Sequence, residues 1–188
     1  MQRILASLTI VLFLGLVIAR AFVMRRAGTK AVYFANIDRK DFLILPFAFL
    51  YIYIVVAEPL GLPAVTEQEF FRSEARSWVG VFLCALGLVL FFFSLVSFGR
   101  SFRVGIDTDH PGKLITTGAF ALSRNPIYIA FWIIMFGQFL IFSNVILLAY
   151  LPGAAWLFHR QVLREEDFLR KQYGQEYVDY CNRVKRYL

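Results

Sequence analysis

The stretch Ile127–Phe158 reads IYIAFWIIMFGQFLIFSNVILLAYLPGAAWLF and is apolar almost throughout. As a single helix it would be about 48 Å long, whereas the hydrocarbon core of a bilayer is about 30 Å thick. The polar pair Ser143-Asn144 divides the stretch into two arms, and Pro152-Gly153 weakens the second arm. We therefore predict a tight helical hairpin in a membrane, with both of its ends on the same side.

The composition of the whole chain also indicates a membrane protein. Of the 188 residues, 59% are hydrophobic and 18% are charged, whereas soluble chains average about 45–50% and about 25%. The charged residues are confined to a few short segments, as expected when a charge at the bilayer centre costs a few kcal/mol or more. We predict a single membrane domain over residues 1–188.

Three further apolar segments precede the hairpin. They run over Ile4–Val23, Phe42–Ala57 and Trp78–Phe98. The second is short for a span, which needs about 20 apolar residues, and Pro46 is placed to kink it. The sequence therefore predicts an all-α integral membrane fold with five transmembrane helices, of which the first three occupy residues 1–98 and the last two form the hairpin.

The part of the chain after the hairpin changes character. From Arg160 to Leu188, aromatic and aliphatic residues recur at helical spacing among charged ones, and Gly174 interrupts the pattern. This pattern predicts an amphipathic C-terminal helix, broken near Gly174, that lies on the cytoplasmic face of the membrane. With the polar segment before the hairpin, it makes residues 99–188 the functional part of the domain.

Lysine and arginine residues predict the orientation in the membrane. The segments 24–41, 99–125 and 159–188 would share one side, and they hold most of the 20 Lys and Arg residues. The other side holds Arg3, Arg72 and Arg76. Because short cytoplasmic segments carry the excess of positive charge, we predict an N-terminus outside and a cytoplasmic C-terminus, in a bacterial-type inner membrane.

The net charge of +7 suggests an anionic partner. In a membrane chain, such an excess contacts anionic lipid, so we expect membrane lipid and no nucleic acid. Cys84 and Cys181 look like unpaired thiols. His110 and His159 have no further ligand at metal spacing, so no metal site is predicted. The sequence carries no signal for an oligomeric state.

A polar cassette, Lys113–Tyr128, precedes the hairpin and reads KLITTGAFALSRNPIY. Gly118 permits a positive φ or a close backbone approach. The Asn125-Pro126 pair favours a helix whose first residue is Pro126. Arg124 would then lie at the cytoplasmic mouth near a helix N-terminus, where its planar fork suits a carboxylate or a phosphate.

Glu165 and Glu166 leave the other arm of the hairpin at about the same depth as Arg124. Two carboxylates there could bind ribose hydroxyls, an amine or a cation. Each residue also has a structural interpretation: Arg124 as an interfacial anchor, the two glutamates as a solvated face, Tyr128 as an aromatic-belt residue and Gly118 as a loop turn. Their combination across one hairpin favours a binding site.

These residues resemble the signature of the isoprenylcysteine carboxyl methyltransferase family, which includes bacterial relatives and phospholipid methyltransferase-like proteins. The family pattern has Leu-Val-x-x-Gly-x-Tyr, then Arg-His-Pro-x-Tyr, a membrane hairpin, a Glu-Glu pair and a tail with Phe/Tyr-Gly-x-x-Tyr-x-x-Tyr. In this chain the corresponding segments are Leu114–Phe120, Arg124–Tyr128, Glu165-Glu166 and Tyr173–Tyr180. The resemblance covers about Lys113 to Tyr180.

The resemblance implies a methyltransferase that uses S-adenosylmethionine and acts on a lipidic or prenylated small acceptor, either a carboxylate or an amine, at the cytoplasmic face. The cofactor-binding residues that it implies are Lys113, Leu114, Ile115, Gly118, Phe120, Arg124, Pro126, Tyr128 and Glu165. The catalytic residues that it implies are Arg124, Asn125, Tyr128, Glu165 and Glu166. Three positions depart from the family pattern, with Asn125 and Gly112 in place of His and Phe120 in place of Tyr.

Methyl transfer from a sulfonium is an in-line displacement, in which alignment and exclusion of water supply most of the catalysis. An aromatic face such as Phe120 or Tyr128 attracts the sulfonium. A carboxylate acceptor is already a nucleophile, which Arg124 would position. An amine acceptor needs a base such as Glu165. The sequence does not choose between these two acceptors.

Two other functions remain open from the sequence. Membrane sterol or enone reductases, which use NADPH, carry a related Arg-x-Pro-x-Tyr segment. It usually reads Arg-x-Pro-Asn-Tyr, which Ile127 fits poorly. The second alternative is a non-catalytic membrane protein that keeps the fold, and the Asn125 substitution favours it.

Overall fold

The computed structural model describes residues 1–26, 44–65, 70, 73–99 and 113–188. Within these ranges the chain is helical and contains no strand. The elements are α1 (Gln2–Arg26), α2 (Ile44–Val56), α3 (Glu74–Phe98), the short 3-10 helix η3 (Gly118–Ala121), α4 (Pro126–Phe142), α5 (Val145–Tyr173) and α6 (Gln175–Arg183). The predicted all-α class is confirmed.

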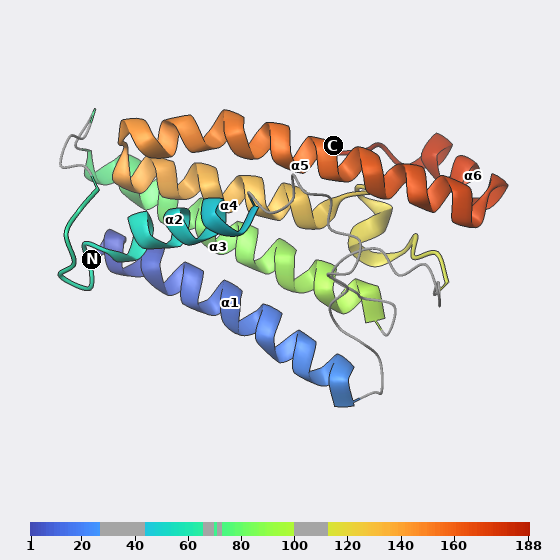
Figure 1. The fold of residues 1–188 in the computed structure, drawn as a ribbon, viewed down its shortest axis with the longest axis horizontal. Helices are drawn as coiled ribbons and strands as arrows, with labels where there is room; N and C mark the ends of the chain where they lie inside the picture. Colours follow the sequence, from blue (N-terminus) through green and yellow to red (C-terminus); the bar gives the residue numbers. More distant parts are fainter. Residues whose placement is uncertain (27–43, 66–69, 71–72, 100–112) are drawn as a thin grey trace.

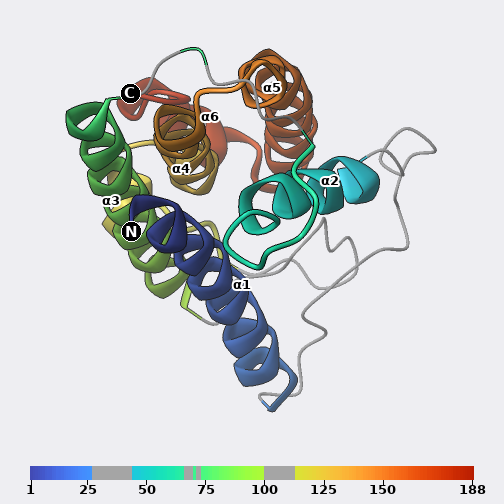
Figure 2. The ribbon, with the colours of Figure 1, turned by 90° about the vertical axis from the view of Figure 1, so that its left-hand side faces the viewer.

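The long helices run side by side in alternating directions and form an elongated bundle (Figure 1). Viewed from the end, α4 lies between α3 and α5, and α1 and α2 pack beneath this layer (Figure 2). The cassette, the C-terminal end of α3 and helix α6 all lie at one end of the bundle, at the right in Figure 1. The N-terminus lies at the other end.

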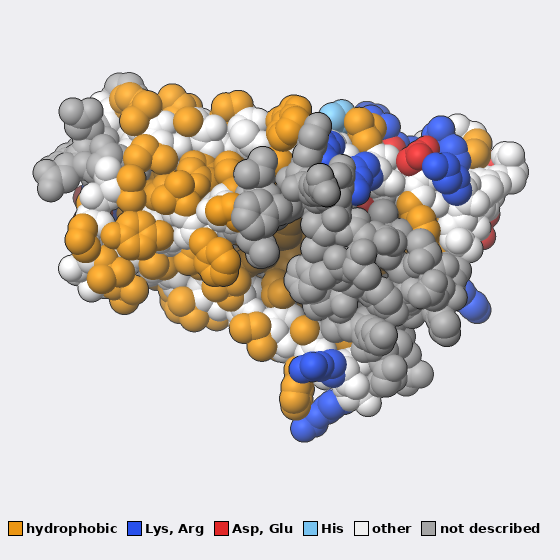
Figure 3. Space-filling view, viewed as in Figure 1, with side chains coloured by type: hydrophobic (Ala, Val, Ile, Leu, Met, Phe, Trp, Pro, Cys, Tyr) orange, Lys and Arg blue, Asp and Glu red, His pale blue; other side chains and the backbone are white. Residues whose placement is uncertain are grey.

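The surface has the character of a membrane protein. Helices α1 and α3, with 25 residues each, are long and apolar enough to cross a bilayer, whereas α2 and α4 are shorter apolar helices. Hydrophobic side chains dominate the left part of the face in Figure 3, and charged side chains gather at the right end. The count of five spans stays a prediction, and Phe42 and Leu43 lie outside the described residues.

The closest helix packing joins α3 to α4. Gly80, Cys84 and Gly87 on α3 are buried against α4. A Cβ atom on Gly80 would lie 2.5 Å from the carbonyl oxygen of Gly137 in α4. Small residues at this spacing allow two helix backbones to approach closely, which is how helices associate in lipid.

Polar side chains join α1 and α2 to α4. Gln138 of α4 is fully buried, accepts a hydrogen bond from the Tyr51 hydroxyl and donates to the carbonyl oxygen of Ala6 at 3.3 Å. The Ser7 hydroxyl donates to the carbonyl oxygen of Val55 at 3.0 Å. In an apolar medium an unpaired buried amide is costly, so these bonds fix how the three helices pack.

The turn between α4 and α5 lies at Ser143-Asn144, where the sequence predicts a break. Ser143 has a left-handed backbone with φ 43°, and the Asn144 side chain accepts a hydrogen bond from the Leu147 amide at 2.8 Å, which caps α5. The first residue of α4 is Pro126, as predicted. Whether both arms of the hairpin cross the membrane stays a prediction.

Two predictions about the second arm are wrong. Helix α5 continues through Pro152, which removes one backbone donor without ending the helix. The segment Arg160–Tyr173 is the continuation of α5 and not a separate amphipathic helix, because it contains no helix-breaking residue. Only α6 is a separate element, and the predicted break at Gly174 is confirmed by its φ of 54°.

Candidate functional site

The cassette begins with a close contact between η3 and the end of α3. Gly118 has a φ of 64°, and a Cβ atom there would lie 2.3 Å from the Ser97 hydroxyl oxygen. That hydroxyl accepts a hydrogen bond from the Ala119 amide at 2.9 Å. Both properties expected of Gly118, a positive φ and a close approach, are therefore present.

Phe120 fixes the cassette between two helices. Its ring packs edge-on against Phe98 of α3, with ring centroids 4.4 Å apart. Its carbonyl oxygen accepts a hydrogen bond of 2.6 Å from the hydroxyl of Tyr180 in α6. Burial raises the pKa of Tyr180 to about 12, so this hydroxyl stays a donor at physiological pH.

The Glu166 carboxylate lies at the centre of a buried polar cluster and is 6% exposed. Its Oε1 accepts from Arg124 Nη2 at 3.0 Å and from Asn125 Nδ2 at 3.3 Å. Its Oε2 accepts from Nε and Nη2 of Arg186 at 3.0 and 2.9 Å. Burial alone would raise the pKa of Glu166, but the hydrogen bond and charge of Arg186 and the charge of Arg124 lower it below its usual value.

Asn125 is the N-cap residue of α4, but its side chain does not cap that helix. Instead Nδ2 donates both to Glu166 and to the carbonyl oxygen of Arg186, the latter at 3.1 Å. The amide at this position thus links the cassette to two other parts of the chain. Asn125 therefore has a bonded place in the cluster.

Glu165 lies beside this cluster in a different environment. Its Oε1 accepts from the Tyr128 hydroxyl at 2.8 Å and from Gln161 Nε2 at 3.0 Å. Burial raises the pKa of the Glu165 carboxyl above its usual value, and the bonds from Gln161 and Tyr128 and the charge of Arg164 offset this only in part. In the described part of the chain both bonds go to Oε1, which leaves Oε2 as an acceptor.

The two adjacent glutamates therefore differ in kind. Neighbouring residues of a helix point about 100° apart, so Glu165 and Glu166 address different partners. Glu166 is saturated by two arginines and an amide, whereas Glu165 is bonded to uncharged groups. The interpretation of this pair as a solvated face is wrong.

The remaining predicted residues take different positions. Pro126 is buried at the start of α4, Leu114 and Ile115 are partly buried in the segment that leads into η3, and Lys113 is exposed. His110 and Gly112 lie outside the described residues. Arg124 Nη1 also donates to the carbonyl oxygen of Cys181 at 3.4 Å, and its buried Nε has no hydrogen-bond partner in the described part of the chain.

Sequence reasoning missed two members of the site. Gln161 lies one helical turn before Glu165, so its i, i+4 spacing could have indicated the contact. Arg186 carried no such signal, because it lies 20 residues after Glu166 and beyond α6.

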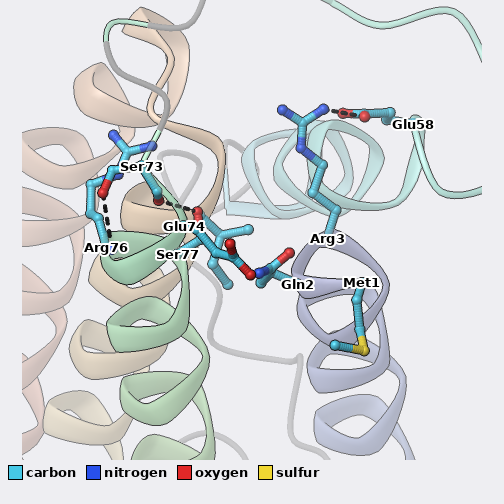
Figure 4. A pocket seen from close by; sticks show the side chains of 9 residues that line it. Met1, Gln2, Arg3, Glu58, Ser73, Glu74, Arg76 and Ser77 are labelled. Carbon is cyan, nitrogen blue, oxygen red and sulfur yellow. Dashed lines mark hydrogen bonds and ion pairs between the residues drawn. The ribbon is translucent and has the colours of Figure 1, made fainter.

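A separate polar pocket of about 570 Å³ lies at the opposite end of the bundle (Figure 4). It is lined by Met1, Gln2, Arg3, Glu58, Ser73, Glu74, Arg76, Ser77 and Ile141. Arg3 pairs with Glu58, and Arg76 donates to the Ser143 hydroxyl. The pocket contains none of the predicted site residues.

Comparisons with known proteins agree with the motifs. The family model for phospholipid methyltransferase matches residues 75–176, which include α3, the cassette, α4 and both glutamates. A protein of Oryza sativa subsp. japonica, "Probable protein-S-isoprenylcysteine O-methyltransferase", is 31% identical over 190 residues, which cover 97% of this chain and 93% of that protein. Protein-S-isoprenylcysteine O-methyltransferase B of Arabidopsis thaliana is 28% identical over 130 residues, which cover 65% of this chain and 66% of that protein.

A solved structure has a similar fold. The eukaryotic intramembrane Ras methyltransferase, isoprenylcysteine carboxyl methyltransferase, matches with a TM-score of 0.56 at 20% identity. The match covers 94% of this chain, which spans 65% of the length of that structure. The relatives named here are eukaryotic, so they give no support to the predicted bacterial-type membrane.

The matches are to methyltransferases and not to reductases, and the cassette, the hairpin and the acidic pair that carry the sequence motif lie together at one end of the bundle. The chain belongs to the isoprenylcysteine carboxyl methyltransferase family and is an integral membrane methyltransferase.

Proposed function

We propose that this protein transfers a methyl group from S-adenosylmethionine to the carboxylate of a lipidic or prenylated acceptor at the cytoplasmic face of the membrane. The observation that carries the proposal is the buried Glu165 carboxylate, held by the Tyr128 hydroxyl and Gln161 next to the Arg124–Glu166 cluster. The names of the relatives, which are carboxyl O-methyltransferases, support a carboxylate acceptor over an amine.

The donor groups of the site fit S-adenosylmethionine. Arg124 Nε is a buried donor without a partner in the described residues, which suits the carboxylate of the cofactor's amino-acid end. Glu165 Oε2 is an acceptor for an ammonium or a ribose hydroxyl. Buried polar atoms with unused hydrogen-bonding capacity beside a cluster of aromatic rings are characteristic of a ligand site.

The chain's own groups position the reactants. Glu165 and Tyr128 hold the cationic end of the site, and the Phe120 and Tyr128 rings offer faces to a sulfonium. When bound, S-adenosylmethionine supplies the methyl carbon, which bonds to a carboxylate oxygen of the acceptor as its bond to sulfur breaks and the electron pair stays on sulfur. Because no proton moves, Glu165 acts as an ionised ligand and not as a base.

The apolar part of the acceptor has an aromatic surface beside this site. The Tyr128 ring lies 6.1 Å from Phe131 and 5.7 Å from Phe158, which are themselves 5.5 Å apart between centroids. All three belong to α4 and α5 and follow the helices away from the charged cluster. An amphipathic acceptor can therefore place its carboxylate near Tyr128 while its apolar chain stays among rings.

Binding measurements test the proposed cofactor. In detergent-solubilised protein, isothermal titration should give saturable binding of S-adenosylmethionine and no binding of NADPH. Saturable NADPH binding would support the reductase alternative instead. A folded sample that binds neither compound would favour the non-catalytic alternative.

Transfer of a labelled methyl group tests the acceptor. We expect label to enter a prenylated thioether carboxylic acid but not the corresponding amide, which lacks the nucleophilic oxygen. Mild alkali should release the label as methanol, because methyl esters hydrolyse under these conditions. Label that resists alkali would show transfer to nitrogen and would contradict the proposed carboxylate acceptor.

The raised pKa of Glu165 predicts how activity depends on pH. The proposed role needs the carboxylate, so kcat/KM should fall as the pH drops through the raised pKa. This acid limb should lie above the ordinary glutamate value of about 4.3. The Glu165→Gln variant should lose the limb in its residual activity. A wild-type profile that stays flat down to the ordinary glutamate range would contradict the assignment.

A further inference from the structure

The segment Val184–Leu188, here called the strap, follows α6 and turns back over the cassette. Val184 has extended backbone angles, with φ −124° and ψ 130°. The Arg124 amide donates to the carbonyl oxygen of Lys185 at 3.0 Å. The carbonyl oxygen of Arg186 accepts from the Ser123 hydroxyl at 3.1 Å and from Asn125 Nδ2 at 3.1 Å. The backbone of the strap is therefore hydrogen-bonded to the cassette.

The side chains of the strap reach α5. Arg186 donates two hydrogen bonds to Glu166, and the Tyr187 hydroxyl lies 2.9 Å from Nδ1 of His159. His159 and Glu166 are seven residues apart, so they lie on the same face of α5 two turns from each other. The strap follows this face and joins it to the cassette.

We propose that Arg186 is a positioning residue for methyl transfer, which holds Arg124 and Asn125 in place through Glu166. This inference rests on the proposed function. Glu166 Oε1 binds Arg124 and Asn125, and Oε2 binds Arg186, so one carboxylate couples the strap to both cassette residues. The bidentate bond from Nε and Nη2 fixes the orientation of the carboxylate in a way that a single point charge does not.

Without Arg186, the Glu166 carboxylate is free to rotate towards Arg124 and to take up its unused Nε. The donor that the site offers to a ligand would then be occupied within the protein. The cassette would also lose the strap's hold on the Ser123 hydroxyl and the Arg124 amide if the strap detaches. Both changes weaken ligand binding rather than the packing of the bundle.

Arg186→Ala, compared with Arg183→Ala, tests the proposal. Arg183 is exposed, bonds to the carbonyl oxygen of Asp179 in its own helix and carries the same charge, so it is a matched control. In Arg186→Ala we expect the dissociation constant for S-adenosylmethionine to rise about tenfold or more. Arg186→Lys should lie between, and Arg183→Ala should match the wild type.

A second readout needs no cofactor. Hydrogen exchange of the peptide that contains Arg124 should accelerate about tenfold or more in Arg186→Ala, because its amide bonds to the strap. The unfolding temperature, measured in parallel, shows whether the bundle itself is intact. Unchanged exchange and an unchanged dissociation constant in a wild-type background that binds the cofactor would overturn the role of Arg186 alone.

A double-mutant cycle keeps the test decisive if Arg186→Ala does not fold. Glu166→Gln, Arg186→Gln and the double variant should all weaken binding to a similar extent, because Arg186 acts through Glu166. Effects that multiply in the double variant would mean that Arg186 acts independently and would refute the coupling. A folded wild type that binds no S-adenosylmethionine would overturn the proposed function and, with it, this role.

Discussion

Glu165→Gln should lower kcat/KM for methyl transfer by about 100-fold or more, equivalent to about 2.7 kcal/mol of transition-state stabilisation. The substitution removes a buried negative charge from the cationic end of the proposed site. The glutamine oxygen can still accept the Tyr128 hydroxyl, so the local geometry survives. A methyl-transfer assay at saturating acceptor measures the loss.

The same variant should be at least as stable as the wild type. Burial raises the pKa of Glu165 in the folded protein, so its ionised form at neutral pH opposes folding, and glutamine removes that cost. Asp167→Asn is the matched control, because Asp167 is exposed and pairs with Lys171 one turn away. Turnover that survives Glu165→Gln at the level of Asp167→Asn would mean that Glu165 is not part of the site.

Gly137→Ala should strongly destabilise the bundle. The added Cβ would lie 2.7 Å from the carbonyl oxygen of Gly80 and 3.0 Å from the amide nitrogen of Cys84. Overpacking costs about 1–3 kcal/mol where side chains can move, and here the obstacles are backbone atoms, so we expect the upper end or more. At about 2–4 °C per kcal/mol, the unfolding temperature should fall by about 6–12 °C.

Gly15→Ala provides the comparison for this helix substitution. A Cβ on Gly15 in α1 would meet nothing within 4 Å. Because alanine is the better helix former by about 0.8–1.0 kcal/mol, this variant should be neutral or slightly more stable. If both variants unfolded at the same temperature in mixed micelles, close backbone packing of α3 on α4 would not be what limits stability.

Much of the architecture could be predicted from local chemistry. Pro126 starts a helix because its fixed φ and missing amide suit the first turn, Gly174 ends one because it tolerates positive φ, and Ser143-Asn144 supplies the turn and the cap. Gly118 followed from the same reasoning. In each case one residue type determines the backbone by itself.

The missed features depend on partners far away in the sequence. Gln138 looked like an isolated polar residue in an apolar run, yet it joins three helices by contacts with Tyr51 and Ala6. Arg186 looked like one more basic residue of a solvated tail. Neither periodicity nor composition contains the tertiary contact that gives these side chains their roles.

The acidic pair shows a further limit of sequence reasoning. Glu165 and Glu166 are chemically identical, and a motif treats them as one unit. Their environments differ because helical rotation turns one towards Tyr128 and the other towards two arginines. Only the placement of α5 against the cassette and the strap separates an ionised ligand from a structural anchor.

The continuity of α5 through Pro152 links the site to the thickness of the surrounding lipid. One uninterrupted helix runs from Val145 to Glu165, a rise of about 30 Å, so the carboxylate sits at a fixed height above the turn at Ser143-Asn144. A bilayer with longer or shorter acyl chains must adapt to this rod by tilting it or by changing its own local thickness. The height that an acceptor's headgroup must reach then depends on the membrane, and lipid chain length becomes a setting of the reaction that no residue near Glu165 controls.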